Sequence, residues 1–521
     1  MVTDGVSKLV IRYTRNGNWP SLAWVAHCPT GSGSIDVLHG HRVETHPDWF
    51  CEAVWDGEFS AGNFDETDIV AGTGGRSVDG AVVFVSSGST VDRLQYFSDS
   101  HGLWISNSLC ALLSTIGAHV DPTYPDFSAD FHSIVNGLHA YKQEIDTSRG
   151  PVQLVYFNNV RWDGYRVSEQ PKPNASRDFS SFDRYHAFLT SAMQSMARNA
   201  QDLQRAYPYE LLCPISNGHD SPTVAVLARN AGCSRAFTFD VSREGTDDSG
   251  GRIGQLLGMK TTVIARNEWR SMPLPETLFI AGAASAGEVI FKGAESLLGG
   301  TVLLTGFTGD AVWGKKVADE HGHLLRTDAS GLCLTEYRLH AGFIHCPVPF
   351  WGARQASEIS AISRSKDLEQ WDIGGKGARP ICRRIVEEAG VPRAWFGQGK
   401  RGVSVQLFRP GRFLEPRTIE DYFRFLAETA DEWRRRGRIR PRPFLARMLD
   451  FILRYLIGVL RFMLTIKLLW RIRLYSAPLR RLLHCLDGMV YIRRYTFPWA
   501  LARTQALYDA EDAADLRHGP G

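Results

Sequence analysis

The sequence predicts an α/β protein with a β-rich N-terminal domain, a parallel-sheet domain and a helical C-terminal region. Three observations support this fold class. Short β-branched and aromatic runs, separated by Gly, Asp, Asn and Ser, occur throughout residues 1–175. Apolar strand-like runs alternate with helical patterns over residues 180–410, which indicates βαβ units. Residues 411–521 carry mostly helical patterns.

The totals are those of a globular protein of two or three domains, with 521 residues, 44% of them hydrophobic and 22% charged. The nine cysteines form no C-x-x-C pair and several lie in apolar runs, so we expect buried free thiols in a reducing cytoplasm. Residues 1–4 begin no apolar signal segment, which favours a cytoplasmic protein over a secreted one.

The elements follow from local pattern. We expect N-terminal strands at residues 9–13, 21–27, 81–86, 103–106 and 152–157. A polar, Pro-rich stretch near residues 170–185 predicts a linker. Beyond it we expect a helix at 185–204, the end of a helix at 254–259, and strands at 211–213, 235–240, 260–265 and 301–304. Parallel units of this kind place their ligands at the carboxyl ends of the strands.

The stretch 211–222, Leu-Leu-Cys-Pro-Ile-Ser-Asn-Gly-His-Asp-Ser-Pro, indicates a buried strand, a small polar turn and a helix start. Pro222 suits the first helical turn, where its missing N–H would have no partner. Backbone N–H groups and the helix dipole favour an anion there, and Gly218 lets a phosphate approach the main chain. Asp220 fits such a cradle if it holds Mg²⁺ beside the phosphates. The alternative is an ordinary strand-to-helix turn.

Two later stretches carry related signals. Residues 303–314, Leu-Leu-Thr-Gly-Phe-Thr-Gly-Asp-Ala-Val-Trp-Gly, again indicate a strand, a glycine-rich turn and an acid, Asp310. Residues 396–405, Phe-Gly-Gln-Gly-Lys-Arg-Gly-Val-Ser-Val, place Lys400 on a loop flanked by glycines.

In order and spacing these three stretches resemble the asparagine synthetase-like family. Its ATP pyrophosphatase (PP-loop) domain carries a Ser-Gly-Gly-x-Asp-Ser loop, a Leu-Ser-Gly-Glu-Gly-x-Asp-Glu-x-Phe-Gly element and a Lys-x-Gly-Phe-x-Pro segment. The resemblance covers residues 180–410 well and 1–170 faintly. It implies an ATP- and Mg²⁺-dependent ligase that activates a carboxylate as an acyl-adenylate and passes it to an amine. The identity of the carboxylate and of the amine stays open.

The resemblance also implies site residues. Ser216 and Ser221, with the backbone around Gly218, would hold the pyrophosphate, and Asp220 and Asp310 would hold Mg²⁺. Further nucleotide-lining positions are Ile215, Phe239, Thr305 and Gly306. The competing interpretation is that the aspartates and serines cap helices and that Ile215, Phe239, Thr305 and Gly306 are ordinary core or turn residues.

Lys400 matches the family's catalytic lysine, which stabilises charge on the reacting adenylate and on the leaving pyrophosphate. The alternative is that Lys400 and Arg401 form an exposed basic pair.

The N-terminal region resembles a glutamine amidotransferase shell. Residues 54–59, 96–99 and 103–108 loosely follow the class II amidotransferase domain of the same family. That domain needs a nucleophilic cysteine directly after the initiator Met, whereas position 2 is Val2 and the first cysteine, Cys28, is internal. We therefore expect a degenerate amidotransferase-like sandwich domain without glutaminase activity.

Some positions depart from the family pattern. Phe307 replaces the family's glutamate in the second element and can act neither as acid nor as base. The later Glu-x-Arg-x-Pro-Phe element has no clean match, and Glu336 and His345 are the candidates for a base. A buried structural histidine is the competing interpretation for His345. These departures leave a non-catalytic ATP-binding or scaffold protein as an alternative function.

The C-terminal region is strongly basic. Fourteen Lys and Arg stand against one acid, Asp450, over residues 434–481. Arg447, Arg454 and Arg461 recur every seven residues on an otherwise apolar helical stretch, 444–475. Within 451–469 the cations Arg454, Arg461 and Lys467 make a bilayer span unfavourable, so the stretch predicts a helix on an anionic membrane surface or one docked on the synthetase-like domain. Nucleic acid is not expected, because little polar surface separates the arginines. A peripheral membrane component of a biosynthetic complex is a further alternative.

Overall fold

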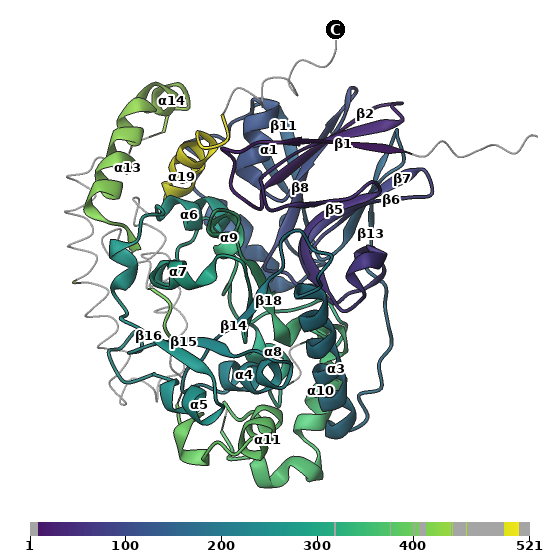
Figure 1. Cartoon of the computed structure of the whole chain (residues 1–521). Coiled ribbons are helices and arrows are strands. Elements are labelled where there is room, and N and C mark those ends of the chain that lie inside the picture. The colour runs from purple at the N-terminus through teal and green to yellow at the C-terminus, as the bar shows by residue number, and fades with distance from the viewer. Residues whose placement is uncertain are drawn as a thin grey trace, which may run out of the picture.

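Figure 1 shows the computed structural model of the chain. The residues that it describes are 9–316, 319–375, 377–399, 402–405, 413–438, 440, 455 and 494–509. A β-rich N-terminal region, mostly antiparallel, is followed by a separate, all-parallel sheet. The coarse fold class that the sequence predicts is therefore confirmed.

The N-terminal region contains two sheets. The strands of the first, in spatial order, are β1 (Val10–Arg15), β3 (Ser34–His39), β2 (Trp24–Pro29), β9 (Gly102–Ser106), β8 (Arg93–Asp99), β11 (Gly150–Tyr156) and β10 (Glu144–Thr147). Its neighbours pair antiparallel except β1 and β3, which are parallel. The strands of the second are β13 (Val167–Gln170), β12 (Asn159–Trp162), β7 (Ala81–Val85), β6 (Val70–Val78), β5 (Trp49–Trp55) and β4 (Glu44–Thr45).

One hydrophobic cluster joins the two sheets, because alternate side chains of each point towards the other. Trp24 of β2 lies at its centre, with its ring centroid 5.0 Å from that of Phe50 on β5 and 6.1 Å from that of Phe84 on β7. All seven residues of β5 are buried, because helix α3 (Phe182–Ala200) covers the other face of this strand. The predicted N-terminal strands all fall on observed strands, displaced by a few residues at their ends.

The parallel sheet has the order β16-β15-β14-β17-β18. Its strands are β14 (Glu210–Pro214), β15 (Arg235–Phe239), β16 (Lys260–Ile264), β17 (Thr301–Thr305) and β18 (Ile344–Pro347). The chain runs outwards from β14 to β16, returns to the other side of β14 and continues to β18. In sheets of this type a ligand crevice forms at the carboxyl ends of the strands where the direction reverses, here between β14 and β17.

Helices surround this sheet (Figure 1). Their bounds are α4 (Asp220–Asn230), α5 (Gly251–Leu256), α6 (Thr277–Ala283), α7 (Glu295–Leu298), α8 (Gly309–Val312), α9 (Leu334–Ala341), α10 (Ala356–Ser363) and α11 (Pro380–Glu388). Helix α4 packs against both β14 and β17, and Pro222 to Ala228 are buried in that contact.

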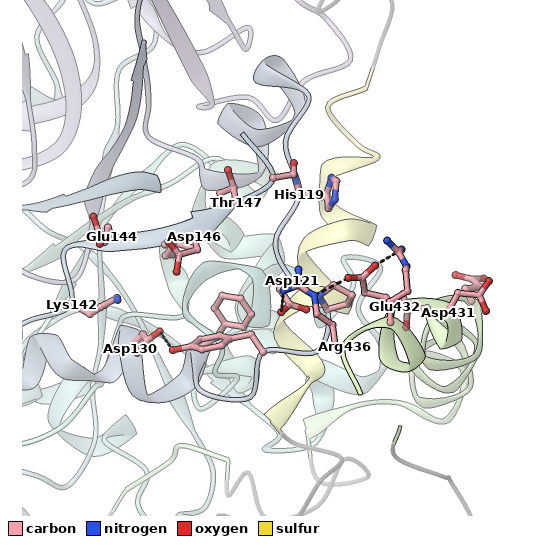
Figure 2. A pocket seen from close by; sticks show the side chains of 18 residues that line it. His119, Asp121, Asp130, Lys142, Glu144, Asp146, Thr147, Asp431, Glu432 and Arg436 are labelled. Atoms are coloured by element: carbon pink, nitrogen blue, oxygen red, sulfur yellow. Dashed lines mark hydrogen bonds and ion pairs between the residues drawn. The ribbon is translucent and has the colours of Figure 1, made fainter. Parts of the chain in front are cut away.

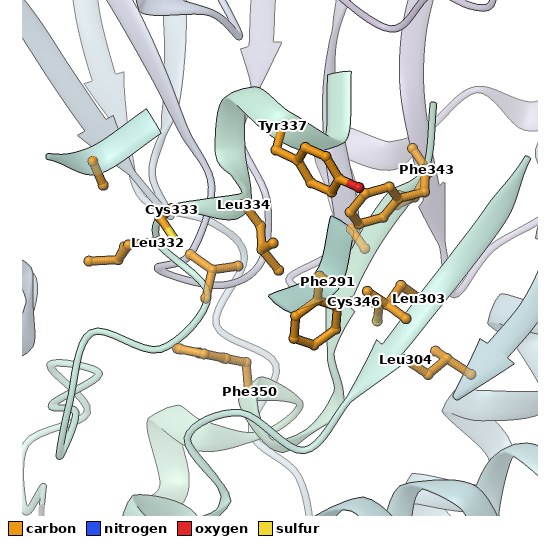
Figure 3. Close-up of a cluster of buried hydrophobic side chains, with 14 of the residues drawn as sticks. Phe291, Leu303, Leu304, Leu332, Cys333, Leu334, Tyr337, Phe343, Cys346 and Phe350 are labelled. Carbon is orange, nitrogen blue, oxygen red and sulfur yellow. The ribbon is translucent and has the colours of Figure 1, made fainter. Parts of the chain in front are cut away.

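The core beneath β17 and β18 holds these strands in place (Figure 3). Leu303 and Leu304 of β17 are buried together with Cys346 of β18 and with Phe291. Tyr337 of α9 is fully buried, and its ring stacks on Phe279 with 4.2 Å between centroids. Because β17 is packed on both faces, the position of its carboxyl end is fixed.

A buried ion-pair cluster joins the N-terminal sheets to the parallel-sheet region. The guanidinium of Arg338 on α9 contacts both carboxylate oxygens of Glu52 on β5, at 2.6 and 3.0 Å. Its Nε donates to Asp92 at 3.0 Å. All three side chains are at most 1% exposed. Burial raises the pKa of Glu52, although the charge of Arg338 acts in the opposite direction.

The described C-terminal residues form helices α13 (Pro416–Glu428), α14 (Ala430–Arg435) and α19 (Thr496–Gln505). Helix α19 packs against α6 and against α1 (Leu109–Ile116) of the N-terminal region (Figure 1). Tyr508, directly after α19, is fully buried and donates its hydroxyl to Glu336 at 2.5 Å. The end of the described chain therefore contacts both preceding regions.

The predicted membrane-surface stretch, 444–475, lies outside the described residues apart from Tyr455. Within the part of the chain that the structure describes, none of the helices combines the length and the apolar character that crossing a bilayer requires.

Candidate functional site

The loops that follow β14 and β17 meet at the point where the strand order reverses. The two strands are neighbours, with Leu212 opposite Leu303, so both loops leave the same edge of the sheet. Each loop leads into a helix, α4 after β14 and α8 after β17. The sequence motifs at 211–222 and 303–314 thus come together at one place.

The first loop is ordered by its two serines. The hydroxyls of Ser216 and Ser221 lie 2.9 Å apart. The Ser216 N–H donates to the Ser221 hydroxyl at 3.0 Å, and the Gly218 N–H donates to the Ser216 hydroxyl at 3.1 Å. These bonds turn the chain tightly at the start of α4, whose positive dipole end attracts anions. Such a turn requires small polar side chains. A tight polar turn between a strand end and a helix start is the geometry expected of a phosphate cradle.

The second loop lies directly on Asp220, the first residue of α4. A β-carbon added to Gly306 would come within 2.8 Å of the Cβ of Asp220, and one on Gly309 within 2.6 Å of its Cγ. Both distances are too short for real contacts, so the loop can approach Asp220 only because these residues are glycines. Between them, Thr308 takes a left-handed backbone with φ of 71°. The two predicted loops therefore form one site.

The two candidate metal-binding carboxylates are held by neighbouring side chains. The Nε of Arg379 lies 2.9 Å from Oδ1 of Asp220, and the Thr327 hydroxyl donates to Oδ1 of Asp310 at 2.6 Å. Burial alone would lower the pKa of Arg379, but the charges of Asp220 and Asp310 outweigh it and raise that pKa. The charges of both carboxylates thus favour the protonated guanidinium.

Mg²⁺ is suited to this pair of carboxylates only in combination with phosphate oxygens. Among the described residues no group of three or more His, Cys, Asp and Glu side chains is placed to hold a metal ion. Mg²⁺ is often bound by one or two carboxylates together with substrate phosphates and water, so two aspartates beside a phosphate cradle fit that mode.

The remaining predicted nucleotide-lining residues are buried around the cradle. Ile215 is 2% exposed, and its N–H donates to the Phe237 carbonyl at 2.9 Å. Phe239, at the end of β15, is 5% exposed and packs edge-on against Phe291. Thr305, the last residue of β17, shares a hydrogen bond of 2.9 Å with His345. Their side chains support the loops, and any contact with a nucleotide would come from the backbone.

Lys400 lies outside the described residues. Before it, the Gly397 N–H donates to the carbonyl of Asn217 in the first loop at 2.8 Å. After it, the Val405 N–H donates to the Gly287 carbonyl at 2.7 Å. Gly397 is therefore held at the first loop.

The two candidate bases differ in their surroundings. His345 is fully buried, and its ring is 5.5 Å from that of Phe307. Burial, and then the charges of Arg338 and Arg326, lower the pKa of His345 to about 3, so the imidazole is neutral and weakly basic at pH 7. Glu336 instead accepts from Ser108 at 2.7 Å and from Tyr508, in the contact with the N-terminal and C-terminal regions.

Glu288 is an acid near Phe307 that the sequence analysis did not single out. Its Oε2 accepts from the Cys333 thiol at 2.6 Å, and burial raises its pKa. Glu288 also accepts a hydrogen bond from the backbone of Gly331. A β-carbon added to Gly331 would lie 3.0 Å from the Phe307 ring. No sequence motif surrounds Glu288 or Arg379. Only the fold brings Glu288 near Phe307 and Arg379 to Asp220.

The N-terminal region has no exposed thiol among its described residues. Cys28, Cys51 and Cys110 are buried and unpaired, as are the other five described cysteines. Burial raises the pKa of Cys28 and of Cys51, which keeps both thiols protonated. The expectation of buried free thiols is confirmed for the eight described cysteines; Cys485 lies outside the described residues.

A cavity of about 490 Å³ lies away from these loops, between the N-terminal region and helices α13 and α14 (Figure 2). Its walls include seven carboxylates and three basic side chains, together with the rings of Tyr124 and Phe127. None of the sequence-predicted site residues lines it.

Comparison with protein-family models and with curated proteins finds no match for the chain.

Proposed function

We propose that the protein is an ATP-dependent carbon–nitrogen ligase of the asparagine synthetase-like type. One observation carries the proposal: two strand-end loops meet at the reversal point of a parallel sheet, with Gly306 and Gly309 packed on Asp220. A crevice of this kind binds phosphates by backbone N–H groups and a helix dipole. Two carboxylates beside it suit a nucleotide that carries Mg²⁺.

Each residue then has a role in forming an acyl-adenylate and pyrophosphate. The hydroxyls of Ser216 and Ser221, with the backbone around Gly218, would hold the pyrophosphate end of the nucleotide. Asp220 and Asp310 would hold Mg²⁺, which neutralises phosphate charge when bound. Lys400 stabilises the charge that develops on the α-phosphate and on the leaving pyrophosphate. An amine then attacks the acyl carbon, forms the amide and releases AMP.

The N-terminal sandwich, in this proposal, is an amidotransferase-like shell without its chemistry. Position 2 is Val2, and the described thiols of the region are buried and protonated. The nitrogen would then come from an amine substrate or from free ammonia, in the cytoplasm.

The second candidate is a nucleotide-binding scaffold without ligase activity. Phe307 supplies no acid or base, and the lowered pKa of His345 makes the imidazole a poor proton acceptor. Such a protein would keep the phosphate cradle, and it could serve as a partner in a larger complex.

Exchange of labelled pyrophosphate into ATP separates the two candidates. A ligase exchanges label in the presence of Mg²⁺ and an acceptable carboxylate from a mixed pool, whereas a scaffold only binds ATP. We expect Asp310→Asn to abolish exchange and Asp328→Asn, an exposed neighbour with the same charge change, to keep it. ATP binding without exchange for any carboxylate in a broad pool would favour the scaffold, and absence of ATP binding would exclude both.

A further inference from the structure

We propose that Arg379 is a phosphate-binding residue that takes the pyrophosphate end of the nucleotide; this rests on the proposed function and names a further ligand of the same site. The observation is its ion pair with the first residue of α4. The Nε of Arg379 lies 2.9 Å from Oδ1 of Asp220, and the arginine side chain is 12% exposed. A guanidinium in this position faces the loop that would hold the phosphates.

The backbone holds Arg379 at this point. It is the residue before Pro380, which disfavours helical backbone in its predecessor, and its φ of −134° and ψ of 77° are non-helical. Arg379 thereby caps helix α11, which packs against α4. The ion pair therefore joins the N-terminal ends of two packed helices, α4 and α11. The positive dipole ends of these helices favour an anion beside the guanidinium.

Two arginines at the start of helix α11 lie against the first loop. Arg379 contacts Asp220, and Nη2 of Arg383 lies 3.4 Å from Nε2 of His219. Arg383 is fully buried and donates to Glu387 at 3.0 Å, which gives that guanidinium its own carboxylate. Arg379 instead is paired with a carboxylate of the proposed site itself.

A guanidinium is well matched to a pyrophosphate oxygen pair, because its planar fork donates two parallel hydrogen bonds. Asp220 contacts this guanidinium through Nε. If Asp220 held Mg²⁺, the same guanidinium would be placed to donate to a neighbouring phosphate oxygen. Arg379 would thus be both the counter-ion of Asp220 and a phosphate ligand.

The competing possibility is that Arg379 only neutralises Asp220. The two possibilities differ once Asp220 has lost its charge. If Arg379 is only a counter-ion, its removal matters little in an Asp220→Asn protein. If it binds phosphate, its removal weakens the binding of pyrophosphate in both backgrounds.

The test is calorimetric titration of the full-length protein with sodium pyrophosphate, with Mg²⁺ and with EDTA. The proteins compared are wild type, Arg379→Ala, Arg379→Lys, Asp220→Asn and the double variant Asp220→Asn/Arg379→Ala. We expect Arg379→Ala to weaken binding at least about tenfold in both backgrounds, because hydrogen bonds to charged groups are lost. Arg379→Lys, which keeps the charge but not the fork, should lie between wild type and Arg379→Ala.

Arg384→Ala is the matched control, because Arg384 lies on the same helix but pairs with Glu388 and Asp183. It should bind pyrophosphate within about twofold of wild type, since its ion-pair partners are Glu388 and Asp183 and not a residue of the first loop. Unchanged binding by Arg379→Ala, or an effect that disappears in the Asp220→Asn background, overturns the role of Arg379 and leaves the proposed function standing. Absence of pyrophosphate binding by the wild type overturns both.

Discussion

Gly309 and Asp220 are packed so closely that a β-carbon on the glycine would lie 2.6 Å from the aspartate Cγ. Gly309→Ala must therefore push the two loops apart, at a cost of about 1–3 kcal/mol in the free energy of unfolding. We expect the thermal stabilisation of the protein by ATP and Mg²⁺ to be lost. Gly17→Ala, at an exposed glycine with no atom within 4 Å of the added carbon, should keep it. Equal stabilisation of both variants would show that the contact between the loops is not needed for binding.

Removing Arg338 would leave Glu52 and Asp92 as buried carboxylates without their cation. Breaking a buried ion pair in this way costs about 3–5 kcal/mol, so Arg338→Met should lower the free energy of unfolding by that amount in urea titrations. Adding Glu52→Gln and Asp92→Asn to the same chain should recover part of the loss. A loss below about 1 kcal/mol, as expected for the exposed pair of Arg12 with Asp36, would contradict the importance of this cluster.

His345 predicts a loss of stability on acidification. Its pKa is lowered to about 3 by burial and by neighbouring arginines, so the unfolded chain takes up this proton below about pH 6.5 while the folded chain does not. The stabilisation is thus fully present above pH 6.5 and lost as the pH falls towards 3, by about 1.4 kcal/mol per pH unit. His345→Gln should lack this part of the pH dependence in urea titrations between pH 7 and 4.5. His101→Gln, at an exposed histidine, serves as control and should behave as wild type.

Glutamine should not serve as nitrogen donor. Val2 stands where the amidotransferase nucleophile is required, and Cys28 and Cys51 are fully buried with raised pKa values. We expect background glutaminase activity and no labelling by a thiol-directed glutamine analogue, read by intact mass. Stoichiometric labelling of Cys28 or Cys51 in the folded protein would refute this prediction.

The features of the fold that could be predicted from the sequence are those that depend on a local pattern of residues. β14 and α4 follow from an apolar run, a polar turn and Pro222, all within a dozen residues, and the same holds for β17 with its glycine turn. Neighbouring parallel strands with ligands at their carboxyl ends then place the loop after β14 beside the loop after β17. The convergence of these loops was therefore predictable.

Other features depend on contacts between distant segments. Nothing around Arg379 indicates a phosphate site, because its partner Asp220 lies far away in the sequence and only the packing of α11 on α4 joins them. Glu288 is the N-cap of a short 3₁₀ helix (Val289–Ala294), where no periodic pattern marks it. Glu336, a candidate base on sequence grounds, is hydrogen-bonded to Ser108 of the N-terminal region and to Tyr508 of the C-terminal region.

Helix α19 has a consequence for how the protein is made. Tyr508 closes a contact between the N-terminal and parallel-sheet regions, yet the ribosome synthesises it after both of them. Until that residue emerges, Glu336 lacks the phenol hydroxyl and Trp19 lacks the ring that covers it at 5.2 Å. The final packing of the two regions thus waits for residue 508, and a chain truncated before it would leave this contact open to proteases and chaperones.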